Sequence, residues 1–220
     1  MNFVTGDAIL RAVRAAPLLF FLFTVLARAG TAAAATVEVT VTDDKGNPLA
    51  DAVVYAMPKV RPAAQPARRE AAIEQKNKTF IPLVTVIQVG TLVNFPNHDT
   101  VRHHVYSFSP ARPFELKLYV GTPASPILFD KPGEVVLGCN IHDNMIAYVY
   151  VVDTPWFAKT DAAGHASLAD VPAGDYDLQV WHFALASPQA AQPLRAGAGK
   201  VTAAFAIPLR AMPPRPAAKS

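Results

Sequence analysis

The most constraining stretch of the sequence is residues 135–151, where Cys139, His142 and Met145 follow one another at a C-x2-H-x2-M spacing. Apolar runs rich in β-branched residues enter and leave this stretch, which is typical of strands. On an α-helix, Met145 would lie about 240° around the axis from Cys139, so the three side chains could not reach one ion. On a short loop between two strands they can. Because Cys, His and Met are donors that suit copper better than calcium or magnesium, the stretch predicts a copper-binding loop.

A second histidine is expected upstream, because a trigonal copper site takes two histidines and one cysteine, with a weak axial methionine. Residues 91–106 are typical of a strand, a turn and a strand, and they contain His103. The two segments together follow the patterns G-x-x-V-x-F-x-N-x5-H-x-V and G-x5-C-x2-H-x2-M. The matching residues are Gly90, Val93, Phe95, Asn97, His103 and Val105 in the first pattern, and Gly133, Cys139, His142 and Met145 in the second.

These patterns resemble the cupredoxins, the small blue copper proteins, over residues 71–152, and the short ligand loop is most similar to that of amicyanin. The resemblance implies an all-β fold, a cupredoxin Greek-key β-sandwich, that holds one copper ion cycling between Cu(I) and Cu(II). The residues that it implies are His103, Cys139, His142 and Met145 as ligands, with His104, Asn97 and Asn140 as supporting neighbours.

His104 stands where the cupredoxin pattern usually has an asparagine. In the family, that asparagine ties the first ligand loop to the cysteine loop by a hydrogen bond, and a ring nitrogen of His104 could do the same. The alternative is that His104 itself binds copper. The N-x5-H spacing from Asn97 favours His103 as the ligand.

Taken one at a time, these residues have plainer interpretations. A lone buried cysteine usually packs as a small hydrophobic side chain, and a lone methionine usually fills the core. The joint occurrence with the upstream motif favours a metal site. The remaining polar candidates are expected to be solvated or to pack, namely Asp99, Glu134 and Asp143 as loop carboxylates, His98 and His165 at the surface, and His182 in packing.

The N-terminal segment predicts export. Arg11 and Arg14 precede an apolar run at residues 16–27, and small residues follow at 30–35, so residues 1–35 are typical of a signal peptide. The alternative is an uncleaved membrane anchor. Export implies a periplasmic protein, with no membrane span expected after cleavage. A single cysteine in an oxidising compartment cannot form an internal disulfide, whereas a copper-bound thiolate would be protected.

The net charge of the chain argues against a nucleic-acid partner. The formal net charge is +3, and it falls to +1 without residues 1–35. The remaining basic clusters, residues 59–69 and 210–219, are rich in proline and alanine and are typical of a linker and a disordered tail. A nucleic-acid partner is therefore not expected.

The sequence on either side of the copper motif resembles a different β-sandwich. Residues 36–42 alternate strictly, and residues 52–56 form a second apolar run after a turn. Residues 160–178 match T-D-x-x-G-x-x-x-L-x-x-V-P-x-G-x-Y-x-L, and residues 200–207 alternate again. Together they resemble the carboxypeptidase-regulatory-like (transthyretin-like) sandwiches.

The predicted organisation is therefore an insertion of one sandwich into another. The expected parts are a signal peptide at 1–35, a discontinuous carboxypeptidase-regulatory-like sandwich at 36–62 and 153–209, an inserted cupredoxin domain at 63–152 and a tail at 210–220. The alternative is that residues 36–56 begin the cupredoxin sandwich and residues 153–209 are an appendage.

A copper site of this kind has no strongly open coordination position, so it favours electron transfer over substrate activation. The predicted function is that of a periplasmic one-electron carrier and not an enzyme. The resemblance suggests a c-type cytochrome or a periplasmic dehydrogenase as redox partner. Copper delivery is the alternative function, and a sandwich that has lost its copper role is a third.

Overall fold

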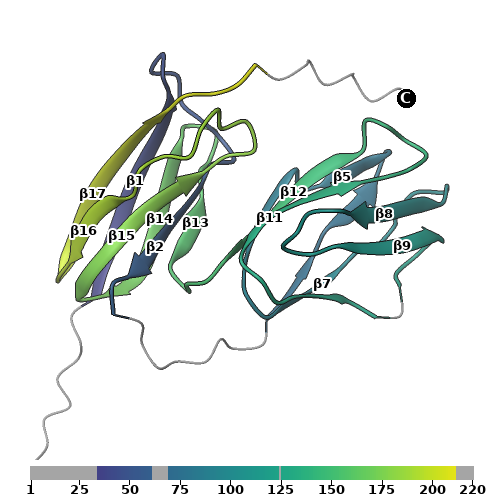
Figure 1. Cartoon of the computed structure of the whole chain (residues 1–220), viewed down its shortest axis with the longest axis horizontal. Coiled ribbons are helices and arrows are strands. Elements are labelled where there is room, and N and C mark those ends of the chain that lie inside the picture. The colour runs from purple at the N-terminus through teal and green to yellow at the C-terminus, as the bar shows by residue number, and fades with distance from the viewer. Residues whose placement is uncertain (1–33, 61–68, 124, 212–220) are drawn as a thin grey trace, which may run out of the picture. The chain divides into compact units, whose positions relative to one another are not determined.

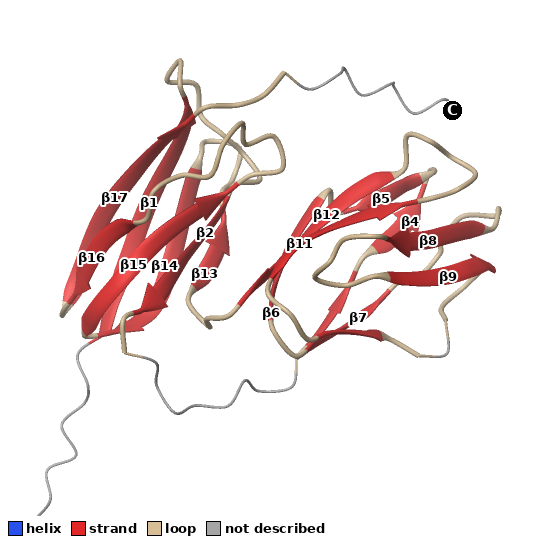
Figure 2. Cartoon of the chain, in the orientation of Figure 1, coloured by secondary structure: helices blue, strands red, loops and turns tan. Residues whose placement is uncertain are grey.

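The computed structural model describes residues 34–60, 69–123 and 125–211 (Figure 1). Residues 1–33 of the expected signal peptide, residues 61–68 of the expected linker and residues 212–220 of the expected tail lie outside the described residues, while the last two residues of the expected signal peptide, 34 and 35, begin the first strand. Within the described ranges, the regular structure consists of strands joined by loops (Figure 2). The all-β prediction is therefore confirmed. None of the described residues form a helix that could span a bilayer.

The first sandwich is built from both ends of the described chain. Its first sheet has the order β14-β1-β17, with β1 (Ala34–Asp43), β14 (His165–Pro172) and β17 (Gly199–Ile207). Its second sheet has the order β13-β2-β15-β16, with β2 (Val53–Pro58), β13 (Phe157–Lys159), β15 (Gly174–Trp181) and β16 (Gln192–Ala196). Strand β16 was not predicted, because Pro193 and Arg195 interrupt its apolar alternation.

The strict alternation of β1 explains its place in this sandwich. Val37, Val39 and Val41 point to the core and are buried, while the residues between them are partly exposed. Strand β1 pairs antiparallel with β14 and parallel with β17. Strand β2 pairs with β13 and β15. Neither β1 nor β2 pairs with a strand from the described part of residues 70–152.

The second sandwich contains the copper motif. One sheet has the order β10-β7-β3, and the other has the order β6-β12-β11-β8-β9, with the hairpin β4-β5 beside them. The strands are β3 (Glu70–Ala72), β4 (Glu74–Lys76), β5 (Thr79–Ile81), β6 (Val84–Gln88), β7 (Thr91–Asn94), β8 (His103–Ser107), β9 (Phe114–Tyr119), β10 (Ile127–Phe129), β11 (Gly133–Gly138) and β12 (Ile146–Val152).

The core of the second sandwich supports the ligand loop. Alternate residues of β11 and β12, such as Val135, Leu137 and Val149, are fully buried in one apolar cluster that also contains Cys139 and Met145. Strands β11 and β12 pair as an antiparallel hairpin, with Gly138 opposite Ile146. The hairpin register thus closes the loop at residues 139–145 and presents it at one end of the sheet.

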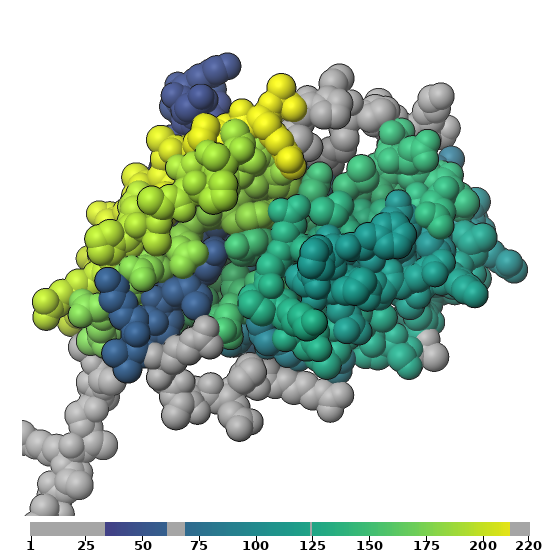
Figure 3. Space-filling model, viewed as in Figure 1, coloured from purple at the N-terminus to yellow at the C-terminus, as the bar shows by residue number. Residues whose placement is uncertain are grey.

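The two sandwiches contact each other through apolar side chains, and the space-filling view shows residues of both packed against each other (Figure 3). Val53 and Trp181 of the first sandwich cluster with Val84, Tyr148 and Val152 of the second. Polar bonds cross the same contact: the hydroxyl groups of Tyr55 and Tyr150 lie 3.0 Å apart. The Trp181 indole N–H donates to Glu134 at 3.1 Å. Glu134 therefore has a structural role here, and is not the solvated loop carboxylate that the sequence suggested.

Candidate metal centre

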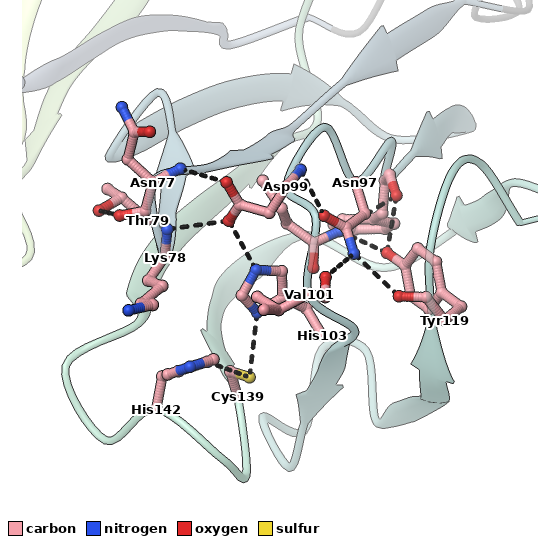
Figure 4. Close-up of polar contacts among 12 residues, drawn as sticks. Asn77, Lys78, Thr79, Asn97, Asp99, Val101, His103, Tyr119, Cys139 and His142 are labelled. Atoms are coloured by element: carbon pink, nitrogen blue, oxygen red, sulfur yellow. Dashed lines mark hydrogen bonds and ion pairs between the residues drawn. The ribbon is translucent and has the colours of Figure 1, made fainter. Parts of the chain in front are cut away.

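Three of the predicted ligands meet at the end of the second sandwich. His103 begins β8, Cys139 follows β11, and His142 lies in the loop before β12 (Figure 4). The Cys139 Sγ is 4.0 Å from His103 Nδ1 and 3.9 Å from His142 Nδ1. One donor atom from each of the three residues lies within 4.8 Å of the others. Segments that are far apart in the sequence thus place a thiol and two imidazoles around one point.

The spacing of these atoms fits a metal ion. The Cys139 Sγ lies 3.9 to 4.0 Å from both imidazole nitrogens, so one metal ion with bonds of about 2.0 Å to nitrogen and about 2.3 Å to sulfur could reach all three donors. Two histidines and one cysteine are the donor set of a blue-copper site.

Met145, the predicted fourth ligand, is buried at the end of the ligand loop. Its side chain is 1% exposed and belongs to the same core cluster as Cys139. Its backbone N–H donates to the carbonyl of His142 at 2.9 Å, which tightens the loop. The role of Met145 as an axial ligand stays a prediction.

Gly138 allows a tyrosine to pack directly against the cysteine strand. A Cβ atom at this position would lie 2.7 Å from the ring and hydroxyl of Tyr106, which pairs with Gly138 across the sheet. Real Cβ atoms do not approach this closely, so any larger residue would displace the tyrosine or the strand. The glycine that precedes Cys139 is therefore part of how the site is built.

His103 is held by the carboxylate of Asp99, which the sequence pattern had indicated to be solvated. Its Nε2–H donates to Asp99 Oδ2 at 2.7 Å. Asp99 also accepts the backbone N–H groups of Asn77 at 2.6 Å and Lys78 at 2.9 Å (Figure 4). Its side chain is only 12% exposed. The expectation for Asp99 was wrong because its partners are on the β4–β5 turn, which is more than 20 residues away.

The β4–β5 turn has an unusual backbone that suits this contact. Asn77 and Lys78 have φ angles of 53° and 55°, in the left-handed region that two-residue hairpin turns require. The turn presents its two N–H groups to one carboxylate. The sequence does place Asp99 four residues before His103, but this spacing alone does not predict a hydrogen bond between the two side chains.

This arrangement determines which nitrogen of His103 is free. A carboxylate only accepts hydrogen bonds, so the Nε2 atom of His103 carries the proton and Nδ1 keeps its lone pair towards Cys139. Partial burial raises the pKa of Asp99, but hydrogen bonds from Lys78, His103 and Asn77 outweigh it, and the pKa ends below its usual value. Asp99 is therefore ionised when it holds the ring.

His142 is the more accessible of the two histidines. Burial lowers the pKa of His142, and the nearby His103 and Lys78 lower that pKa further. The ring is therefore neutral at neutral pH, which is the form that binds a metal. His142 is partly exposed, whereas His103 is fully buried.

Asn97 supports the loop that contains Asp99. Its side-chain amide donates to the carbonyls of Val101 and Tyr119 at 2.9 and 2.8 Å, and its side-chain oxygen accepts the N–H of Asp99 at 2.9 Å. Asn97 is buried, and its bonds to Asp99 and Val101 order the turn before His103, while the bond to Tyr119 ties that turn to the end of β9. Its supporting role in metal binding stays a prediction.

His104 does not lie with the three candidate ligands. Its Nε2–H donates to Glu115 on β9 at 2.8 Å, and its buried Nδ1 has no hydrogen-bond partner among the described residues. Among the described residues, the convergent group contains His103 and not His104. His104 and the exposed Asn140 line one hollow beside the ligand loop. The supporting roles predicted for both residues remain predictions.

The other polar candidates lie outside the convergent group. His98 is exposed beside Glu74, Asp143 is exposed in the ligand loop, and the His165 ring contacts the Thr40 hydroxyl in the first sandwich. His182 is buried in the first sandwich and accepts the N–H of Ala184 at 3.1 Å.

No family model and no curated protein matches this sequence. Among solved structures, a Cu-containing nitrite reductase from Thermus scotoductus SA-01 is 28% identical, with a TM-score of 0.36, over 43% of this chain and 25% of its own. The chain thus spans only a quarter of that enzyme.

Two smaller solved proteins are similar over most of their own length. A purple cupredoxin from Nitrosopumilus maritimus is 23% identical, with a TM-score of 0.34, over 37% of this chain and 99% of its own. Amicyanin from Paracoccus versutus is 16% identical, with a TM-score of 0.32, over 44% of this chain and 91% of its own. Solved structures similar to part of this chain therefore include cupredoxins, as the sequence patterns predicted, while the carboxypeptidase-regulatory-like resemblance stays a prediction.

Proposed function

We propose that this chain is a periplasmic type 1 copper protein that carries single electrons between redox partners and is not an enzyme. The observation that supports this most is the convergence of His103 Nδ1, Cys139 Sγ and His142 Nδ1 from three separate segments. Copper bound there would supply a Cu(I)/Cu(II) couple, with Met145 as the proposed weak axial ligand.

The burial of the ligands favours electron transfer over catalysis. Cys139 is 4% exposed, and His103 and Met145 are buried more completely. Side chains fixed in this way keep the same arrangement when the charge of the site changes, and they leave no open position for a substrate. His142 alone is partly exposed, so its ring edge is the proposed route for electrons to a partner.

The partner is proposed by resemblance and by chemistry. A c-type cytochrome or a periplasmic dehydrogenase would approach the His142 side of the loop, where Ile141 is 50% exposed. Redox encounters of this sort use small, short-lived interfaces. The signal segment predicted from the sequence supports the periplasmic location, and residues 1–33 of it lie outside the described residues.

Copper delivery is the competing function, and two measurements on the copper-loaded protein separate it from electron transfer. Voltammetry should show a reversible one-electron couple, and a competing Cu(I) chelator should remove the metal slowly, because the thiol and His103 are buried. Rapid, complete transfer to the chelator without a reversible couple would instead support delivery.

A further inference from the structure

The β4–β5 turn places a lysine beside the accessible candidate ligand His142. Lys78 lies in this turn, and its backbone N–H donates to the Asp99 carboxylate that also binds His103. In Figure 4, the Lys78 side chain extends from the turn towards the side of the site where His142 lies. Lys78 is exposed, so a molecule that approaches the ligand loop can reach its ammonium group.

Two charged side chains act on the His142 ring. Burial and the neighbouring His103 lower the pKa of His142 most, and Lys78 lowers that pKa further, while Asp99 opposes this. The Asp99 side chain is only 12% exposed and is bound by His103 and by two backbone N–H groups. Lys78 therefore carries the charge that an incoming molecule meets first at the His142 ring edge.

Both signs of charge occur elsewhere at this end of the second sandwich. The other cations are Lys76, Arg102 and Lys117, and the other acids are Glu74, Glu115 and Asp143. Glu74 lies 3.5 Å from the His98 ring, and Glu115 accepts the N–H of His104 at 2.8 Å. These cations and acids balance in formal charge, so the sign that a partner meets at the His142 ring edge is set by Lys78.

We propose that Lys78 determines the specificity of electron transfer at the His142 ring edge, by selecting redox partners that present an anionic group beside their own cofactor. This rests on the proposed electron-carrier function. The exchange moves one electron and no atoms, leaving the site as Cu(II) and the partner reduced by one electron. An ammonium group attracts an anionic partner and repels a cationic one, so it raises the encounter rate of the first and lowers that of the second.

The first test needs no metal in the protein. Hexacyanocobaltate(III), a trianion that does not readily exchange electrons or ligands, is titrated into the metal-free protein at low ionic strength while backbone amide signals are followed by NMR. The wild-type shifts should centre on residues 77–78 and 141–142. Lys78→Gln should lose these shifts, and Lys78→Arg should keep them, because arginine restores the charge. The backbone N–H of residue 78, which binds Asp99, remains in each variant.

Lys200→Gln is the matched control, because the Lys200 side chain is 67% exposed on β17 of the first sandwich. It removes the same charge far from the ligand loop and should leave the shifts there unchanged. Shifts that persist in Lys78→Gln overturn the proposal, and so does a wild-type ligand loop that does not respond to the anion. Since no copper is present, either failure leaves the copper assignment standing.

The second test compares oppositely charged oxidants of the reduced, copper-loaded protein. Ferricyanide and tris(phenanthroline)cobalt(III) each accept one electron, giving ferrocyanide and the cobalt(II) complex. At low ionic strength, Lys78→Gln should slow oxidation by ferricyanide about three- to tenfold and should speed oxidation by the cobalt cation. Both effects should shrink as salt is added. Rates that change in the same direction with both oxidants would contradict the proposal, because they would indicate an altered copper site instead.

Discussion

The two candidate histidine ligands are held in opposite ways. His103 is fully buried, and its Nε2–H donates to the Asp99 carboxylate. That carboxylate in turn accepts two backbone N–H groups of the β4–β5 turn. His142 lies in the ligand loop and is partly exposed, and its Nδ1 atom lies 3.9 Å from the Cys139 Sγ. The difference indicates that the β8 side sets the geometry of the site, while the loop side is where it can meet a partner.

The largest effect on the copper site is expected at Cys139, whose sulfur lies next to both histidine rings. Cys139→Ser should abolish the intense visible absorption of the copper-loaded protein, because the thiolate carries the charge-transfer transition of a blue-copper site. Met145→Leu should keep the colour and raise the reduction potential, since an axial ligand only tunes it. Visible spectra of the loaded variants test both, and a serine variant that stays blue would refute the assignment.

The next comparison separates neighbouring histidines on β8. His103→Ala should lose the trigonal site, because it removes one of the three converging donor atoms. His104→Ala should keep the site with metal affinity reduced about 10- to 100-fold, the usual cost of losing a group that supports a ligand. Copper titration monitored by absorption measures both. The reverse order would mean that the ligand register is wrong by one residue.

Substitution of Asp99 tests whether its carboxylate orients the His103 ring through the Nε2–H hydrogen bond. Asp99→Asn removes the charge that holds the Nε2 proton, so metal affinity should fall about 10- to 100-fold, with a shifted reduction potential. Asp143→Asn is the control, because Asp143 is an exposed acid in the ligand loop. Copper competition titrations should leave the control near wild type. Equal losses in both variants would point to a general charge effect rather than to orientation of His103.

The smallest expected effect concerns His182, which is buried in the first sandwich. Burial lowers the pKa of His182 in the folded state, although Asp51 and the Ala50 backbone oppose this. The unfolded chain then binds a proton more readily, so stability should fall as the pH drops below about 6.5. The pH dependence of the urea midpoint measures this. His182→Gln should flatten the dependence; an unchanged slope would show that His182 is not its source.

The sequence predicted the ligand loop and the all-β class because both depend on local patterns. Alternation in β1 and the apolar runs around Cys139 report directly on which side chains face a core. The Asp99 contact and the Trp181–Glu134 bond were missed because each joins residues far apart in the chain, where periodicity carries no information. The division into an inserted and a discontinuous domain remains a prediction, which expression of residues 66–153 alone would test.

Copper-edge X-ray absorption of the copper-loaded wild-type protein shows whether His103, Cys139 and His142 together hold one copper ion, because it counts the sulfur and nitrogen neighbours of the metal. We expect one short sulfur ligand and two nitrogen ligands, with the sulfur lost in Cys139→Ser. A copper ion surrounded only by nitrogen and oxygen in the wild-type protein would contradict it.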